Sequence, residues 1–133
     1  MLSKQSIKNL RRVAKFLFAE PRRFNMNAGV EPTLNHVMKE QPPCGTACCI
    51  GGAAYLIKNK TKLIEPLELG WNRVAGEAVV FLDLQKEQEG RLFHVSSWPL
   101  AYKTLYNEAK TAHELAAVGV LRIEHFISTG GDE

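Results

Sequence analysis

The chain gathers all three of its cysteines, Cys44, Cys48 and Cys49, into one segment that follows a double proline. From there to Ala54, no side chain in this segment is larger than isoleucine. A turn at Pro-Pro-Cys-Gly followed by small apolar residues predicts a helix with Thr46 as its N-cap. Cys44 would then lie at a helix N-terminus, where the helix dipole stabilises a thiolate, so Cys44 is the candidate nucleophile.

The string Cys44-Gly45-Thr46-Ala47-Cys48 looks like the active-site segment of bacteriocin-processing cysteine peptidases, in which Cys-Gly-x-Ala opens the central helix. This resemblance implies a cysteine hydrolase that uses Cys44 together with His125. Those peptidases carry their histidine on a strand, whereas His125 stands in the most regular helical pattern of the chain. The competing interpretation is that the cysteines are small apolar side chains that pack around a thin helix.

Clustered thiols also bind metal ions. Cys44, Cys48 and Cys49 offer three ligands for a tetrahedral zinc site, which one histidine would complete. The histidines of the chain are His36, His94, His113 and His125. Structural zinc sites usually take two separated pairs of ligands, whereas here a single cluster is combined with scattered histidines. We therefore expect neither a metal ion nor another cofactor.

A helix that begins near Thr46 would also point its first main-chain N–H groups at an anion. Gly45 leaves that backbone bare and Thr46 adds a hydroxyl, although the lysine of a phosphate-binding P-loop is missing. Arg91 and Arg122 are the preferred cations, and Trp98 offers a ring on which a base would stack. We therefore predict a non-catalytic binding module for a small anionic, nucleotide-like ligand.

The N-terminal segment is strongly basic. The first 23 residues carry seven bases and one acid, a net charge of +6, whereas the remaining residues carry a net −3. Such a segment attracts phosphate-bearing partners. It supports a second alternative, a nucleic-acid or protein interaction module that binds through Lys4, Lys8, Arg12, Lys15, Arg22 and Arg23. The competing interpretation is the solvated outer face of an amphipathic helix.

Apolar residues recur at helical spacing along most of the chain, which predicts an all-α fold. In a first helix capped by Ser3 and stopped by Pro21, the inward residues are Ile7, Leu10, Ala14, Leu17 and Phe18. Further helices are expected at 71–82, 84–93, 97–109 and 112–127, the last one ended by Gly130-Gly131. Only residues 79–82 also suit a strand. We predict one compact domain, residues 1–133, with five or six helices around the thin central helix that runs from about 46 to 58.

Size and composition limit the class of protein. With 133 residues, of which 45% are hydrophobic, the chain is large enough to bury a core without disulfides. No apolar run reaches about eighteen residues, so we expect no membrane span, and the N-terminus lacks the apolar core of a signal peptide. An odd cysteine count predicts reduced thiols in the cytoplasm.

The layout resembles an uncharacterised family of small bacterial and phage proteins nearly from end to end. The motifs that carry the resemblance are Glu20-Pro21-Arg22-Arg23-Phe24-Asn25-Met26, Cys44-Gly45-Thr46 with Cys48 and Gly51, Gly90-Arg91-Leu92-Phe93 with Trp98-Pro99, and Arg122-Ile123-Glu124-His125-Phe126-Ile127 with Gly130-Gly131. This family brings no known activity. By analogy with other small phage proteins, we expect a sequestering role that counters a host defence.

Overall fold

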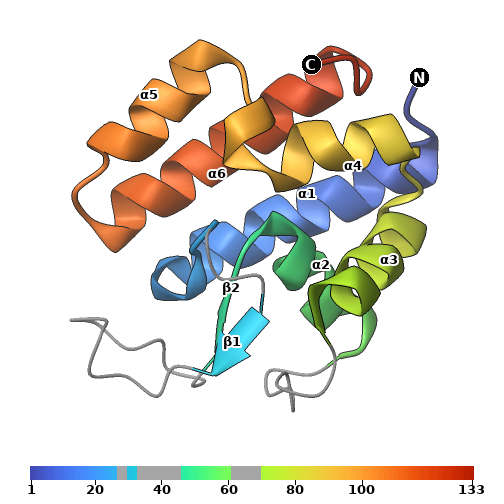
Figure 1. Ribbon diagram of the computed structural model, residues 1–133, viewed down its shortest axis with the longest axis horizontal. Coiled ribbons are helices and arrows are strands. Elements are labelled where there is room, and N and C mark those ends of the chain that lie inside the picture. Colours follow the sequence, from blue (N-terminus) through green and yellow to red (C-terminus); the bar gives the residue numbers. More distant parts are fainter. Residues whose placement is uncertain (27–29, 33–45, 61–69) are drawn as a thin grey trace.

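The computed structural model describes residues 1–26, 30–32, 46–60 and 70–133. The elements in these ranges are α1 (Lys4–Ala19), η1 (Pro21–Arg23), β1 (Val30–Pro32), β2 (Thr46–Cys48), α2 (Ile50–Lys58), α3 (Gly70–Leu82), α4 (Lys86–Phe93), η3 (Val95–Ser97), α5 (Leu100–Glu108) and α6 (Ala112–Ser128), where η denotes a short 3-10 helix. Six α-helices form a bundle (Figure 1), so the prediction of an all-α fold with five or six helices is confirmed.

α1 begins and ends where the sequence predicts. The Ser3 hydroxyl accepts a hydrogen bond of 3.0 Å from the main-chain N–H of Ser6, which caps the first turn. The helix ends before Pro21, because a proline ring would clash with the preceding turn and has no N–H to continue the hydrogen-bond ladder. The boundaries of α1 therefore follow from local chemistry alone.

One face of α1 is apolar and buried. Leu10, Val13 and Leu17 have no exposed surface, and α1 packs most extensively against α6. Phe18 was predicted on this face, but it is 76% exposed. Successive residues of a helix are turned by about 100°, so the residue after Leu17 leaves the buried stripe and reaches the outer side of α1.

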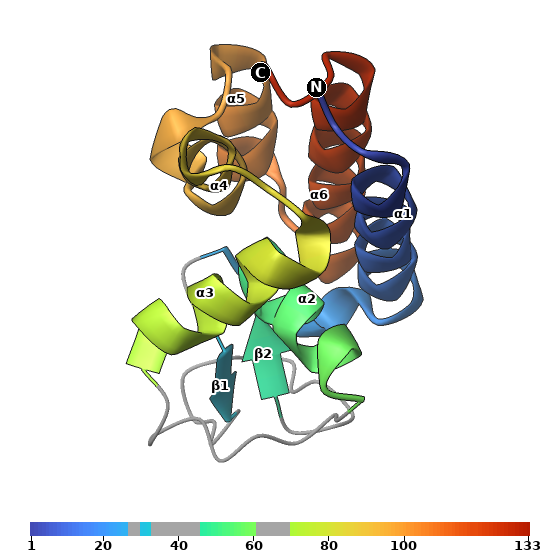
Figure 2. The ribbon, with the colours of Figure 1, turned by 90° about the vertical axis from the view of Figure 1, so that its right-hand side faces the viewer.

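α6 lies antiparallel beside α1, and both views show the two helices adjacent (Figures 1 and 2). Gly119 lies at their contact, where the lack of a side chain leaves space for the Phe24 ring. Gly130 and Gly131 have φ angles of 66° and 87°. These left-handed conformations end α6 as predicted, because glycine adopts them without steric cost.

α2 is the central helix, but it begins three residues later than predicted. Its N-cap is Cys49, whose Sγ accepts a hydrogen bond of 3.3 Å from the main-chain N–H of Gly52. Thr46, the predicted cap, lies instead in β2. Every residue from Ile50 to Leu56 is buried, and α2 packs against α3 and α1. A helix built from small residues does occupy the interior.

Two short strands precede α2. β1 and β2 pair antiparallel, with Val30 opposite Cys48 and Pro32 opposite Thr46. The sequence predicted no strand at either segment and a helix start at the second, because three-residue strands are too short to show an alternating pattern. Pairing between segments distant in the chain satisfies main-chain N–H and C=O groups in a way that local sequence does not reveal.

The second half of the chain follows the predicted order of helices. Residues 79–82, which also suited a strand, form the last turn of α3. Gln85 and Gln88 cap α4 reciprocally, each side chain bonding to the other's main chain. α5 begins at Leu100, with Pro99 as its N-cap, whereas Ser97, the predicted start, lies in η3. Figure 2 shows α4, α5 and α6 at one end of the molecule and α2, α3 and the strands at the other.

Candidate functional site

Three of the five residues predicted to bind an anion come together where α4, η3 and α6 meet. The guanidinium of Arg122 donates a hydrogen bond of 3.1 Å to the main-chain oxygen of Arg91 and lies 5.9 Å from the centre of the Trp98 ring. Gly45 lies outside the described residues. Thr46 lies in β2, at the opposite end of the molecule from the chain's C-terminus (Figure 2).

Arg122 is a cation enclosed by aromatic rings. It is fully buried, and its guanidinium lies 5.7–5.9 Å from the ring centres of Trp98, Tyr102 and Phe126. It also donates a hydrogen bond to the main-chain oxygen of Glu133. Among the described residues its Nε has no acceptor. Burial lowers the pKa of Arg122 to about 10, opposed by Tyr102 and Glu133, so the group stays charged at neutral pH.

Arg91 and Trp98 also direct their polar atoms inward. Arg91 donates a hydrogen bond of 3.1 Å to the main-chain oxygen of Gly131, and Trp98 Nε1 donates one of 2.9 Å to Leu92. The Trp98 side chain is only 2% exposed, so a base has no access to its ring. Of the predicted cluster, Trp98 and Arg122 are buried where α4 and α6 meet, whereas Arg91 is partly exposed.

The predicted cysteine chemistry falls largely outside the described residues. Cys44 is not among them, and Cys48 is described only by its main chain in β2. Cys49 is 1% exposed and serves as the N-cap of α2. The His125 ring lies against the Tyr102 ring, with centroids 4.9 Å apart and planes tilted by 37°. Catalysis by Cys44 and His125 therefore stays a prediction.

Within the described residues, no group of three or more His, Cys, Asp or Glu side chains lies close enough to hold a metal ion. His36 lies outside these ranges, as does Cys44. None of the helices in the described ranges is long and apolar enough to cross a membrane.

The outer side of α1 carries five bases, which we call the basic face: Lys4, Lys8, Arg11, Arg12 and Lys15. All five are exposed, and α1 contains no acidic residue. Their spacing places them within an arc of roughly 100° around the helix, opposite the buried stripe. α1 lies along one side of the molecule in Figure 2.

The bases exposed at this end of the chain differ in two positions from those predicted to contact a partner. Arg23 is fully buried, where it pairs with Glu20 at 3.4 Å and lies 5.1 Å from the centre of the Phe16 ring, so it cannot reach a partner. Arg11 was not among the predicted contact residues, yet it is exposed between Lys8 and Lys15. Its spacing of three and four residues from those lysines is the signal that would have identified it. Arg22 is exposed, as predicted for a contact residue.

A hollow of about 340 Å³ adjoins the basic face where α1 meets α2. We call it the α1–α2 hollow; it is lined by Arg12, Lys15, Phe16, Ala19 and Ile57. The Arg12 guanidinium lies 5.4 Å from the centre of the Phe81 ring, and this contact positions the Arg12 side of the hollow. This hollow does not follow from the sequence, because it depends on how two helices separated by thirty residues come together.

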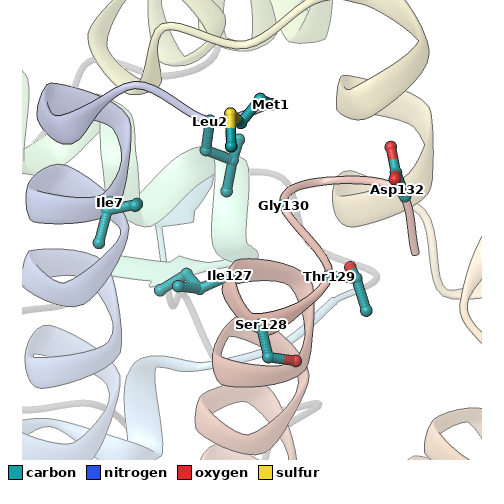
Figure 3. A pocket seen from close by; sticks show the side chains of 8 residues that line it. All are labelled: Met1, Leu2, Ile7, Ile127, Ser128, Thr129, Gly130 and Asp132. Carbon is teal, nitrogen blue, oxygen red and sulfur yellow. The ribbon is translucent and has the colours of Figure 1, made fainter.

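A second hollow, of about 530 Å³, lies between the start of the chain and the end of α6 (Figure 3). Ile7 and Ile127 extend toward each other across it, with Met1 and Leu2 on a further side. No lysine or arginine lines it among the described residues, and the Ser128 hydroxyl is committed to the main-chain oxygen of His125. Asp132 adds a carboxylate to the lining, which disfavours an anion.

Comparison with known proteins gives no assignment of function. The chain matches no protein-family model, no curated protein and no solved structure. The resemblance to a family of small bacterial and phage proteins stays a prediction.

Proposed function

We propose that this chain is a non-catalytic binding module whose basic face on α1 holds the phosphate backbone of a nucleic acid. The observation that carries this proposal is the arrangement of five exposed bases on one side of a single helix. None of the five forms an ion pair with an acid among the described residues. Within the described residues, no carboxylate therefore competes with a partner for these charges.

The spacing of the charges suits a repeating anion. From Lys4 to Lys15 the face is roughly 17 Å long, at 1.5 Å per helical residue. One strand of a nucleic acid duplex presents a phosphate about every 3.4 Å along its axis, so the face spans about five phosphates. A small anion would need cations that converge on one point, whereas these bases form a row.

The crowding of like charges on the basic face also lowers the stability of α1. Five pairs of like charges occur at spacings of three or four residues: Lys4–Lys8, Lys8–Arg11, Lys8–Arg12, Arg11–Lys15 and Arg12–Lys15. Each such pair destabilises a helix by about 0.2–0.5 kcal/mol, so together they cost about 1–2.5 kcal/mol. A sequence under no demand for positive charge would place acids at some of these positions. Binding to phosphates offsets this repulsion.

The test compares two doubly substituted variants by fluorescence anisotropy with a labelled 20-nucleotide DNA. Lys8→Gln with Lys15→Gln interrupts the basic face, and we expect about a tenfold loss of affinity and a salt slope that is shallower by about two. Lys86→Gln with Lys110→Gln removes the same charge from exposed positions outside α1 and should bind almost as the wild type does.

Two outcomes would overturn the proposal. Equal losses in both variants would show that only net charge matters. Tighter binding of poly-glutamate than of DNA at the same salt concentration would make the partner an acidic protein.

A further inference from the structure

The α1–α2 hollow opens beside the phosphate-binding row. Arg12 and Lys15 belong both to the basic face and to the rim of the hollow. Phe16, Ala19 and Ile57 supply its apolar lining, and each retains exposed surface. A strand held by the row would therefore pass an apolar surface next to two cations.

The walls of the hollow are supported from within the protein. The guanidinium of Arg23, itself buried and paired with Glu20, lies 5.1 Å from the centre of the Phe16 ring. Arg12 is held over the Phe81 ring of α3. Because these side chains are positioned by their neighbours, a ligand loses little affinity to ordering them.

A nucleobase matches this combination of groups. Its flat face is apolar enough to stack on an aromatic ring, while its attached phosphate needs a cation. The hollow, of about 340 Å³, is shallow and open, so it offers a surface for the face of one base. In a duplex the faces of the bases are covered by their neighbours, so only an unpaired strand can offer one.

We infer that the α1–α2 hollow receives one base of a single-stranded nucleic acid, with Phe16 as the stacking surface and Arg12 and Lys15 on the adjoining phosphates. This inference rests on the proposed function and adds to it a preference for single strands. The ring that stacks on the base is then Phe16 and not Trp98, which the sequence suggested but which is buried.

The experiment uses three labelled DNA probes with equal phosphate counts: a 12-nucleotide thymidine strand, the same strand with abasic sites, and a duplex hairpin. The full-length wild type should bind the thymidine strand at least tenfold more tightly than the abasic strand or the hairpin. In Phe16→Leu this advantage should fall to less than threefold, while affinity for the abasic strand stays the same.

A second variant tests the same site independently, in case Phe16→Leu does not fold. Ala19→Gln changes an exposed residue and fills the hollow with a neutral side chain, so it should also remove the preference for bases. Leu100→Gln, on an exposed position of α5, is the matched control and should keep the preference.

The outcomes separate the two proposals. Equal wild-type affinity for the thymidine and abasic strands would overturn the base site and leave the phosphate row intact. Loss of binding to every probe at low salt would overturn the proposed function and the base site together. A preference that survives both Phe16→Leu and Ala19→Gln would place the base elsewhere and contradict the assignment of the hollow.

Discussion

At the scale of single residues, Arg122 is the most informative side chain. Its Nη2 atom donates to the main-chain oxygens of Arg91 and Glu133, and its faces meet aromatic rings. The other arm of the planar fork, Nη1, lies 3.4 Å from His125 Nδ1. A buried cation is costly, since water no longer solvates it. The geometry offsets this cost with charged hydrogen bonds and cation–π contacts, which a lysine cannot reproduce because it lacks the planar fork.

Arg122→Lys should therefore destabilise the protein strongly although the charge is kept. The loss of two charged hydrogen bonds, at about 1.5–3 kcal/mol each, predicts a loss of about 3 kcal/mol or more in urea unfolding. Arg91→Lys is the charge-matched control: its side chain is partly exposed and donates to one oxygen, so a loss of about 1 kcal/mol is expected. Equal losses would mean that the fork of Arg122 contributes nothing beyond its charge.

At the scale of elements, the contact between α1 and α6 depends on Gly119. A Cβ at this position would lie 2.9 Å from two ring carbons of Phe24 and 3.1 Å from Leu17 Cδ1. Phe24 has little freedom to move, because it is 3% exposed and packs edge-on against Tyr106. Gly76 in α3 is the opposite case, since it is exposed and a Cβ there meets nothing within 4 Å.

Gly119→Ala and Gly76→Ala should thus change stability in opposite directions. Alanine is favoured over glycine by about 1 kcal/mol inside a helix, so Gly76→Ala should raise the midpoint of thermal unfolding. At Gly119 the same gain is exceeded by overpacking, which costs about 1–3 kcal/mol, and the midpoint should fall. If both variants were stabilised, the α1–α6 contact would be looser than the structure indicates.

At the scale of the whole molecule, charge is unevenly distributed. The chain has a net charge of +3, yet the basic face alone carries five positive charges. Salt shortens the range of repulsion between exposed charges, from about 30 Å at 0.01 M to about 8 Å at 0.15 M and 3 Å at 1 M. The stability of the free protein should therefore depend on ionic strength.

We expect sodium chloride, raised from 10 to 500 mM, to stabilise the wild type by about 1 kcal/mol in urea unfolding. Lys8→Gln with Lys15→Gln removes all five like-charge pairs, so this variant should be more stable at low salt and respond less to added salt. Lys86→Gln with Lys110→Gln should respond as the wild type does. An identical response in all three proteins would show that the basic face is not under repulsion.

Local chemistry was sufficient to predict much of this fold. Ser3 and Pro21 bounded α1, and Gly130 and Gly131 ended α6, because caps, proline and left-handed glycines act within one turn of the helix. The start of α2 was misplaced, because a small-residue run looks the same whether it is helix or strand and the pairing partner of β2 is distant in the chain.

The candidate site was predictable only in part. The basic face follows from helical spacing, which the sequence contains. Helical spacing does not show which of the two arginines that follow α1 faces solvent. Arg22 is exposed, whereas its neighbour Arg23 is buried against Phe16. The burial of Trp98 and Arg122 likewise depends on how α4 and α6 meet, so residues chosen for binding became part of the core.

The pairing of α1 with α6 has a consequence for the order of folding. During synthesis on the ribosome α1 is made early, whereas α6 follows more than ninety residues later. Until then the stripe of Leu10, Val13 and Leu17 lacks the surface that covers it most extensively. Contacts so distant along the chain slow folding, because a long loop must close first. Translation that stops within α6 therefore leaves a basic helix with an uncovered apolar side, which is a substrate for chaperones and proteases.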